Sequence, residues 1–254
     1  MQLGLVFLLF FGLANCQLLF ASWLGKDAGQ NNTKILRGLN AECRMLTPNF
    51  DDAFRDRFAD LIRWRRDVRR FRRDPLPAGL LESVVQFASL SPSVGYSQPW
   101  RFICVRNEKL RASIRADFLE CNRDALESYD GERAAMYARL KLAGLEEAPE
   151  HLAVFCETET EAGLGLGRRT MPEMLEYSAV IAVHTLWLAA RAYGLGVGWV
   201  SILNPTNIKS ILDVSPSWKL IAYLCLGYPE EEHQDPELAR HNWEHYRKPE
   251  ILVR

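Results

Sequence analysis

The chain has 254 residues, 48% of them hydrophobic and 25% charged, so its composition is that of a globular protein with one sizeable core. The formal net charge at pH 7 is −1, which argues against nucleic acid or an anionic membrane surface as the main partner. The six cysteines form no C-x-x-C pair and have no zinc-like spacing with the five histidines, so we expect no metal site.

The first 24 residues are mainly apolar and look like a leader. Small residues at positions 14–16 would suit signal-peptide cleavage before Gln17, but no Lys or Arg precedes the apolar run, which resumes at 18–24. A signal peptide, a membrane anchor and a targeting leader all remain open, so the sequence leaves the localisation undecided. A polar linker follows, and we predict a leader and linker over residues 1–45 and one folded domain over 46–254.

The elements of this domain follow from hydrophobic periodicity and turn signals. We expect a sheet flanked by helices, an α+β fold, because helices outnumber strands and regular βαβ spacing is missing. Cys104, Cys156 and Cys225 lie in apolar runs and are expected to be reduced, buried strand residues. In chain order we predict helices over 50–64 and 80–88, a strand over 100–105, a helical stretch over 108–145, a strand over 152–156, a buried helix over 177–193, a strand over 197–202, a short helix from Pro205, a strand over 220–226 and a polar arm beyond Tyr228.

An arginine cluster follows the first predicted helix. It contains Arg65, Arg66, Arg69, Arg70, Arg72 and Arg73, with Asp67 near its start. One interpretation is a solvated basic surface. The other is an anion clamp, because guanidinium groups match phosphate oxygens and stay charged.

Two further segments could face a ligand. Residues 91–100 form a loop rich in hydroxyl and amide groups, from which Ser93 and Gln98 could reach the edge of a planar heterocycle. The glycines of residues 194–198 follow a helix and enter a strand, which is the reverse of the dinucleotide-binding order, so a Rossmann site is a poor interpretation. They favour a tight turn and a close approach of main chain to a flat ligand, and Ser201 by itself would be structural.

The order of these motifs resembles the flavin-dependent nitroreductase superfamily. The resemblance narrows to its BluB family, the 5,6-dimethylbenzimidazole synthases, and covers about residues 54–254. It rests on the motifs at residues 65–69, 92–100, 131–134, 140–144, 186–192, 194–202 and 236–239. The resemblance implies a nitroreductase-like fold with a central, mainly antiparallel sheet, and a domain-intertwined homodimer with FMN at the subunit interface.

The same resemblance implies the residues of the site and their reaction. In this family reduced FMN reacts with dioxygen and is fragmented to 5,6-dimethylbenzimidazole, the lower ligand of cobalamin, and erythrose 4-phosphate. Asp67 and Ser201 match the catalytic positions, and residues 129–145 match a lid. The positions that match FMN contacts are Arg65, Arg66, Asp67, Val68, Arg69, Ser93, Ser97, Gln98, Leu142, Trp199, Val200 and Ser201.

Two other functions stay open. One is an NAD(P)H-dependent FMN nitroreductase or dehalogenase that retains its flavin, and the other is a non-catalytic flavin-binding protein. The sequence does not identify the electron donor, so NAD(P)H could serve indirectly and a flavin reductase could be a partner. A membrane would be a partner only if the leader is retained, and the domain itself resembles cytoplasmic enzymes.

Overall fold

The computed structural model describes residues 48–127 and 144–254. The predicted leader, Leu142 and almost all of the predicted lid over 129–145 lie outside these residues. The chain separates into two units between Arg55 and Asp56, and the sheet with its flanking helices belongs to the second unit. Within the described residues no helix is long and apolar enough to cross a membrane.

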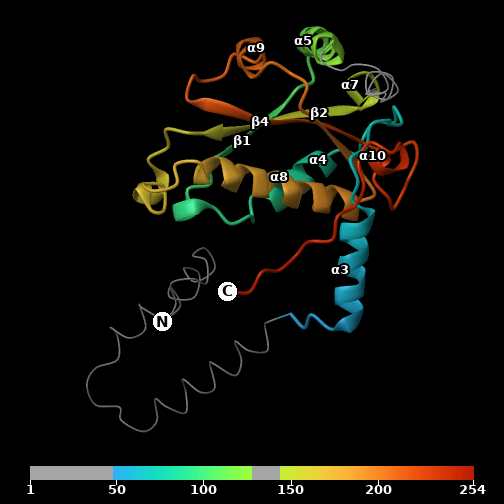
Figure 1. Ribbon diagram of the computed structural model, residues 1–254. Helices are drawn as coiled ribbons and strands as arrows, with labels where there is room; N and C mark the ends of the chain where they lie inside the picture. Colours follow the sequence, from blue (N-terminus) through green and yellow to red (C-terminus); the bar gives the residue numbers. More distant parts are fainter. Residues whose placement is uncertain (1–47, 128–143) are drawn as a thin grey trace, which may run out of the picture. The chain divides into compact units, whose positions relative to one another are not determined.

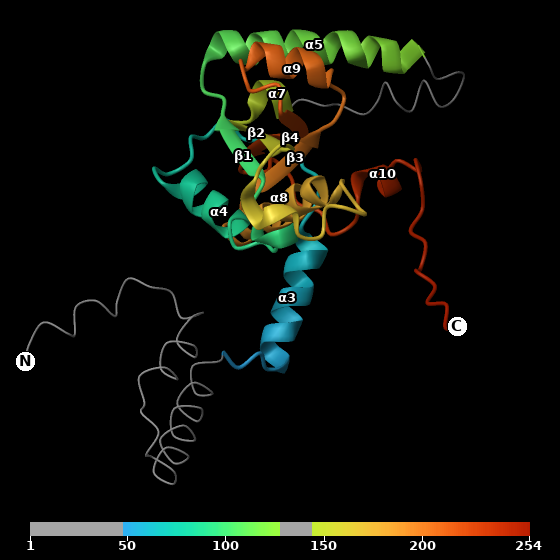
Figure 2. The same cartoon turned by 90° about the vertical axis from the view of Figure 1, so that its left-hand side faces the viewer.

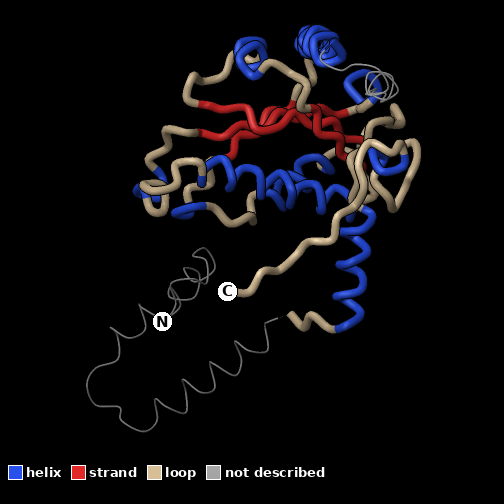
Figure 3. The backbone as a smooth tube through the Cα atoms, in the orientation of Figure 1, coloured by secondary structure: helices blue, strands red, loops and turns tan. Residues whose placement is uncertain are grey.

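A four-stranded antiparallel sheet forms the centre of the fold, in the order β1-β2-β4-β3. The strands are β1 (Trp100–Cys104), β2 (Glu150–Glu157), β3 (Gly196–Val200) and β4 (Trp218–Gly227). The central strand β2 is buried along almost its whole length and β4 along its second half, as their apolar sequences predict. The antiparallel sheet with flanking helices confirms the expected α+β class (Figure 3).

Helices cover both faces of the sheet (Figures 1 and 2). One face carries α4 (Leu80–Ala88) and α8 (Met174–Ala192), while α5 (Glu108–Glu127), α7 (Gly144–Glu147) and α9 (Pro205–Ile211) lie over the other. Alternate residues of a strand point to opposite faces, so Leu152 and Val154 of β2 enter the core under α8, and Ala153 and Phe155 enter the core under α5 and α9.

The predicted helices agree with the observed ones in the described residues. The first helix, α3, spans Asp52–Trp64 and has no buried residue, and the described part of the predicted stretch over 108–145 contains α5 and the first residues of α7. Cys156 and Cys225 are buried as expected, whereas Cys104 is exposed because it lies at the end of an edge strand.

Helix α8 matches the predicted central helix. Its buried side packs on the sheet, but Tyr177, Val180 and Ile181 remain exposed in the single chain. Residues beyond Gly227 contain one short helix, α10 (Glu237–Arg240), and the segment around it pairs with arginines of its own chain, whereas residues 244–254 are exposed and extended (Figure 2). The exposed row of Tyr177, Val180 and Ile181 on α8, a helix that is otherwise largely buried, indicates a surface that another chain could cover.

Candidate active site

The arginine-rich segment that follows α3 lies along the outer edge of β3. Asp67 forms an isolated parallel bridge with Val197, and the Val68 N–H donates to the Val197 carbonyl over 3.0 Å. The approach requires Gly198, because a Cβ there would lie 2.2 Å from the Val68 carbonyl oxygen. The glycines of this strand thus admit the neighbouring main chain of residues 67–69, where the sequence suggested close approach to a flat ligand.

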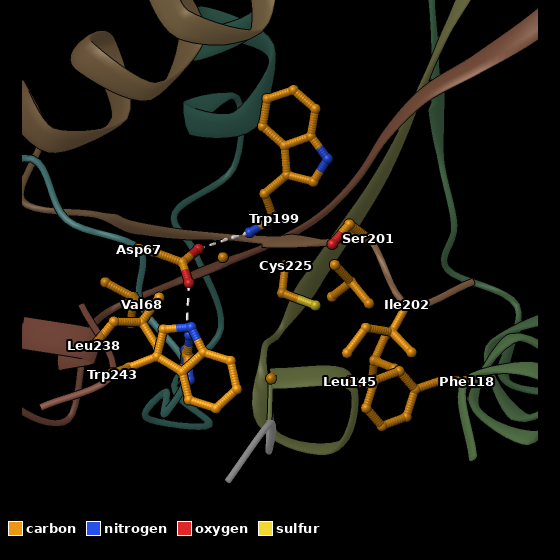
Figure 4. Close-up of a pocket in the computed structure, with 14 residues that line it drawn as sticks. Asp67, Val68, Phe118, Leu145, Trp199, Ser201, Ile202, Cys225, Leu238 and Trp243 are labelled. Atoms are coloured by element: carbon orange, nitrogen blue, oxygen red, sulfur yellow. Dashed lines mark hydrogen bonds and ion pairs between the residues drawn. The ribbon is translucent and has the colours of Figure 1, made fainter. Parts of the chain in front are cut away.

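The close approach brings Asp67 beside the main chain of β3. Its Oδ1 accepts a hydrogen bond from the Trp199 N–H over 3.0 Å, as Figure 4 shows. The side chain is 40% exposed in the single chain, yet the pocket walls surround the carboxylate. Desolvation by these walls is the largest influence and raises the pKa of Asp67, against the lowering effects of the Trp199 N–H and Arg69. Asp67 therefore holds a proton more readily than an ordinary aspartate.

A pocket of about 210 Å³ opens in front of this carboxylate. Figure 4 shows Asp67 with Val68, Leu238 and Trp243 on one side, and Phe118, Leu145 and Ile202 on the other. The pocket is lined by Asp67, Val68, Arg69, Phe118, Gly144, Leu145, Gly198, Trp199, Val200, Ser201, Ile202, Cys225, Leu238 and Trp243. It is thus a mostly apolar recess with a few polar groups, as small-molecule sites usually are.

Arg69 provides the positive charge of the pocket. Its side chain is 12% exposed, and its Nε lies 3.4 Å from Asp67 Oδ2 and 3.6 Å from Glu237 Oε2. Its Nη1 is buried without a hydrogen-bond partner among the described residues. Because a buried unpaired donor is costly, this nitrogen marks a place where an acceptor of a ligand fits.

Ser201 follows the end of β3 and lines the same pocket as Cys225 of β4 (Figure 4). Burial raises the pKa of the Cys225 thiol, so this sulfur is a protonated, neutral part of the wall. The chemically useful groups of the pocket are therefore the Asp67 carboxylate, the Arg69 guanidinium and the Ser201 hydroxyl.

Six of the predicted site residues line this one pocket: Asp67, Val68, Arg69, Trp199, Val200 and Ser201. Arg66 lines a smaller adjoining recess with Arg69, Arg70 and Arg240, and burial together with the Arg65 charge lowers its pKa. Arg65 itself lies over the Trp187 ring, with its guanidinium carbon 4.9 Å from the ring centre. The carboxylates of Asp67, Glu231, Asp235 and Glu237 line the same recess, so its arginines face acidic groups of their own chain as well as any anionic ligand.

The predicted loop residues lie elsewhere in the single chain. Ser93, Ser97 and Gln98 flank η3 (Val94–Tyr96), which is tied to the first turns of α8 by a bond from the Val94 N–H to Ser178 Oγ over 3.1 Å. The other end of α8 reaches the arginine segment, where Trp187 Nε1 donates to the Arg66 carbonyl. About 14 Å of helix separates residues 178 and 187, so none of the three loop residues lines the pocket.

Sequence reasoning missed several pocket residues. Phe118, Leu145 and Cys225 have the apolar character of any core residue, so no local signal distinguishes them. Leu238 belongs to the motif at 236–239, which marked the family without indicating a contact to the pocket. Trp243 reaches the site through the turn after α10, where its N–H donates to the Leu238 carbonyl.

Comparison with known proteins agrees with this architecture. A family model described as the nitroreductase family matches residues 62–228. A 5,6-dimethylbenzimidazole synthase of Rhodospirillum rubrum is 53% identical over 207 residues, which cover 82% of this chain and 98% of that protein. A second one, from Rhodobacter capsulatus, is 44% identical and covers 77% of this chain and 95% of that protein. The crystal structure of oxidized iodotyrosine deiodinase bound to FMN and 3-iodo-L-tyrosine superposes with a TM-score of 0.60 at 25% identity, over 77% of this chain and 97% of that one.

These matches confirm the nitroreductase-like fold and the resemblance inferred from the motifs. The family model covers more than half of the chain, and its span contains the arginine segment, the sheet and Ser201. The chain therefore belongs to the nitroreductase family, and within it groups with the 5,6-dimethylbenzimidazole synthases.

Proposed function

We propose that this chain is a 5,6-dimethylbenzimidazole synthase, which fragments reduced FMN with dioxygen to 5,6-dimethylbenzimidazole and erythrose 4-phosphate. The observation that carries the proposal is 53% identity along nearly the whole length of the Rhodospirillum rubrum synthase. The pocket supports it, because Asp67 and Ser201, the two positions that match the family's catalytic residues, both line it.

FMN fits the groups that the pocket offers. The unpaired Nη1 of Arg69 supplies a donor for an acidic or carbonyl oxygen of the flavin, and Arg66 adds positive charge for its phosphate. Ser97 also has a buried hydroxyl without a partner among the described residues. Reduced FMN, when bound, supplies the electrons for dioxygen and the carbon atoms of the product.

A homodimer would complete this site. Ser93, Ser97 and Gln98 lie at the opposite end of α8 from the arginine segment, so one chain cannot bring both sets to one flavin. The exposed row Tyr177, Val180 and Ile181 on α8 provides an apolar surface for a second copy. A two-fold related copy would place the loop of one chain against the pocket of the other.

Asp67 and Ser201 then have distinct roles. The raised pKa of Asp67 suits a carboxyl group that takes up and returns a proton, and the Trp199 N–H fixes the orientation of its Oδ1. This leaves Oδ2 directed toward the pocket and Arg69. The Ser201 hydroxyl donates or accepts a hydrogen bond at the reacting ring, and the apolar residues around it keep water out.

The test is product formation from reduced FMN in air. The full-length chain should convert FMN stoichiometrically to 5,6-dimethylbenzimidazole, and chromatography measures both compounds. Asp67→Asn and Ser201→Gly should lower the rate by at least about 10²-fold, whereas Asp74→Asn, which alters an exposed aspartate of the same segment, should leave it unchanged. Retention of intact FMN by the wild-type chain would refute the proposal.

A reductase or dehalogenase is the second candidate, favoured by the similarity to iodotyrosine deiodinase. It predicts NAD(P)H-dependent turnover with FMN left intact, and the same chromatograms distinguish the two. A chain that binds FMN but neither consumes it nor turns over NAD(P)H would instead be a non-catalytic flavin-binding protein.

A further inference from the structure

Glu237 is the first residue of α10 and lies on the wall shared by the arginine segment and the carboxyl-terminal segment, residues 228–243. Its side chain is 15% exposed, with Oε2 3.6 Å from Arg69 Nε and Oε1 3.7 Å from His241 Nε2. Few glutamates are this buried, and neither of its ionic contacts is short, so the place of Glu237 beside Arg69 needs an explanation.

The segment that carries Glu237 is fixed at other points. Arg70 pairs with Glu231 over 2.8 Å, and Arg66 Nε donates to the Gln234 carbonyl over 2.6 Å. Both distances are shorter than those around Arg69, so these contacts anchor the segment on the arginine-rich strand. Glu237 is therefore not needed as the main anchor.

Asp67 and Glu237 compete for the same donor of Arg69. A single Nε–H faces two carboxylates, Asp67 Oδ2 at 3.4 Å and Glu237 Oε2 at 3.6 Å, and both distances exceed that of a good hydrogen bond. Glu237 draws the guanidinium from Asp67 and adds a second negative charge beside it. Both effects leave the charge of Asp67 less compensated than in a simple Asp–Arg pair.

We propose that Glu237 is a positioning residue for Asp67, acting through Arg69, which keeps Asp67 able to take up a proton. The role of Glu237 in catalysis rests on the proposed function. The effect of its charge on the protonation of Asp67 does not depend on that function. The raised pKa of Asp67, to which Glu237 contributes after the larger effect of burial, agrees with it.

Several other charged and titratable groups lie near Asp67, and of these His241 also loses a contact when Glu237 is changed. Cys225 of β4 faces Asp67 as a neutral thiol, and His241 contacts Glu237 from the same turn. The recess next to Asp67 is lined by the charged or titratable residues Arg66, Arg69, Arg70, Glu231, His233, Asp235, Glu237 and Arg240. Glu231 pairs with Arg70 rather than Arg69, and the bond from Arg66 Nε to the Gln234 carbonyl still anchors the segment when Glu231 is changed, so Glu231 provides a matched control.

The experiment compares wild type, Glu237→Gln and Glu231→Gln by titrating Asp67 directly. Infrared spectra of the flavin-free, full-length chain with labelled aspartate, taken as differences against Asp67→Asn, report the protonation of this carboxyl group. The two carboxylates are at most about 7 Å apart, so loss of the Glu237 charge should lower the pKa of Asp67 by roughly one unit. Glu231→Gln should change it by much less.

Product formation supplies the second measurement. The limb of the pH–rate profile that depends on Asp67 should move to lower pH by the same amount in Glu237→Gln, and not in Glu231→Gln. An Asp67 pKa that is equal in all three proteins overturns the inference, as does a uniform loss of rate without a shift, which is what a purely structural anchor predicts.

A shifted pKa in a chain that forms no product leaves the inference on Asp67 intact and refutes the proposed function alone. If Glu237→Gln does not fold, Glu237→Asp takes its place. The shorter aspartate side chain moves the carboxylate away from Arg69, so Arg69 interacts mainly with Asp67. The pKa of Asp67 should therefore fall, by a smaller amount than in Glu237→Gln. An unchanged pKa in Glu237→Asp would then overturn the inference.

Discussion

Replacement of Gly198 by alanine tests whether the position of Asp67 depends on close contact between two main-chain segments. The added Cβ would lie 2.2 Å from the Val68 carbonyl oxygen, whereas a carbon–oxygen contact needs about 3.3 Å. The obstacle is backbone, so no side-chain rotation relieves it. The arginine segment must therefore move away from β3 by about 1 Å.

This displacement has two measurable effects. Overpacking of this kind costs about 1–3 kcal/mol of unfolding free energy. A shift of about 1 Å in Asp67, one residue before Val68, lengthens its bond to the Trp199 N–H and should lower the rate of product formation about 10²-fold. The first effect is measured by urea denaturation and the second by 5,6-dimethylbenzimidazole formed in a single turnover.

Gly194→Ala is the control. Gly194 has φ +75° and no atom near an added Cβ, so alanine costs about 1 kcal/mol of left-handed strain without displacing any neighbour. This variant should be destabilised to a similar extent yet keep its rate. A Gly198→Ala protein that forms product as fast as wild type would show that the site tolerates the displacement, and the reasoning would be refuted.

Three other predictions concern charge and assembly. Because its pKa is raised in the folded chain, ionised Asp67 disfavours folding above that pKa, so Asp67→Asn should raise the melting temperature at pH 7 while abolishing product; a lower melting temperature would contradict this. Burial, followed by the Arg111 charge, lowers the pKa of His151 to about 3, so the unfolded chain takes up this proton first as the pH falls below 6.5. The free energy of unfolding, measured by urea denaturation, should then fall by about 2 kcal/mol between pH 7.5 and 5. His151→Gln should remove this pH dependence, whereas His245→Gln, at an exposed histidine, should not. Ile181→Glu, on the exposed row of α8, should give a monomer by light scattering and weaken FMN binding at least about 10-fold; an unchanged dimer would place the interface elsewhere.

The predicted elements agree with the structure where burial is strong. The apolar runs that became β2, β4 and α8 were located within about three residues, because each element carries its own periodicity in the chain. The prediction was wrong at Cys104, which is exposed. Its burial depended on whether its strand lies at the edge of the sheet, which an apolar pattern does not specify.

The candidate site also has a part that the sequence predicted and a part that it did not. The sequence by itself located the arginine cluster that contains Asp67 and Arg69, because that motif is contiguous, whereas Ser201 was singled out by the order of motifs that resembles the family and not by its residue type. Only the tertiary structure decided that these three share a pocket, that Ser93, Ser97 and Gln98 do not join them within one chain, and that Glu237 shares Arg69 with Asp67. The physical reason is that contacts between distant segments follow from the packing of whole elements, such as the approach of Val68 to Gly198, and no local pattern encodes that packing.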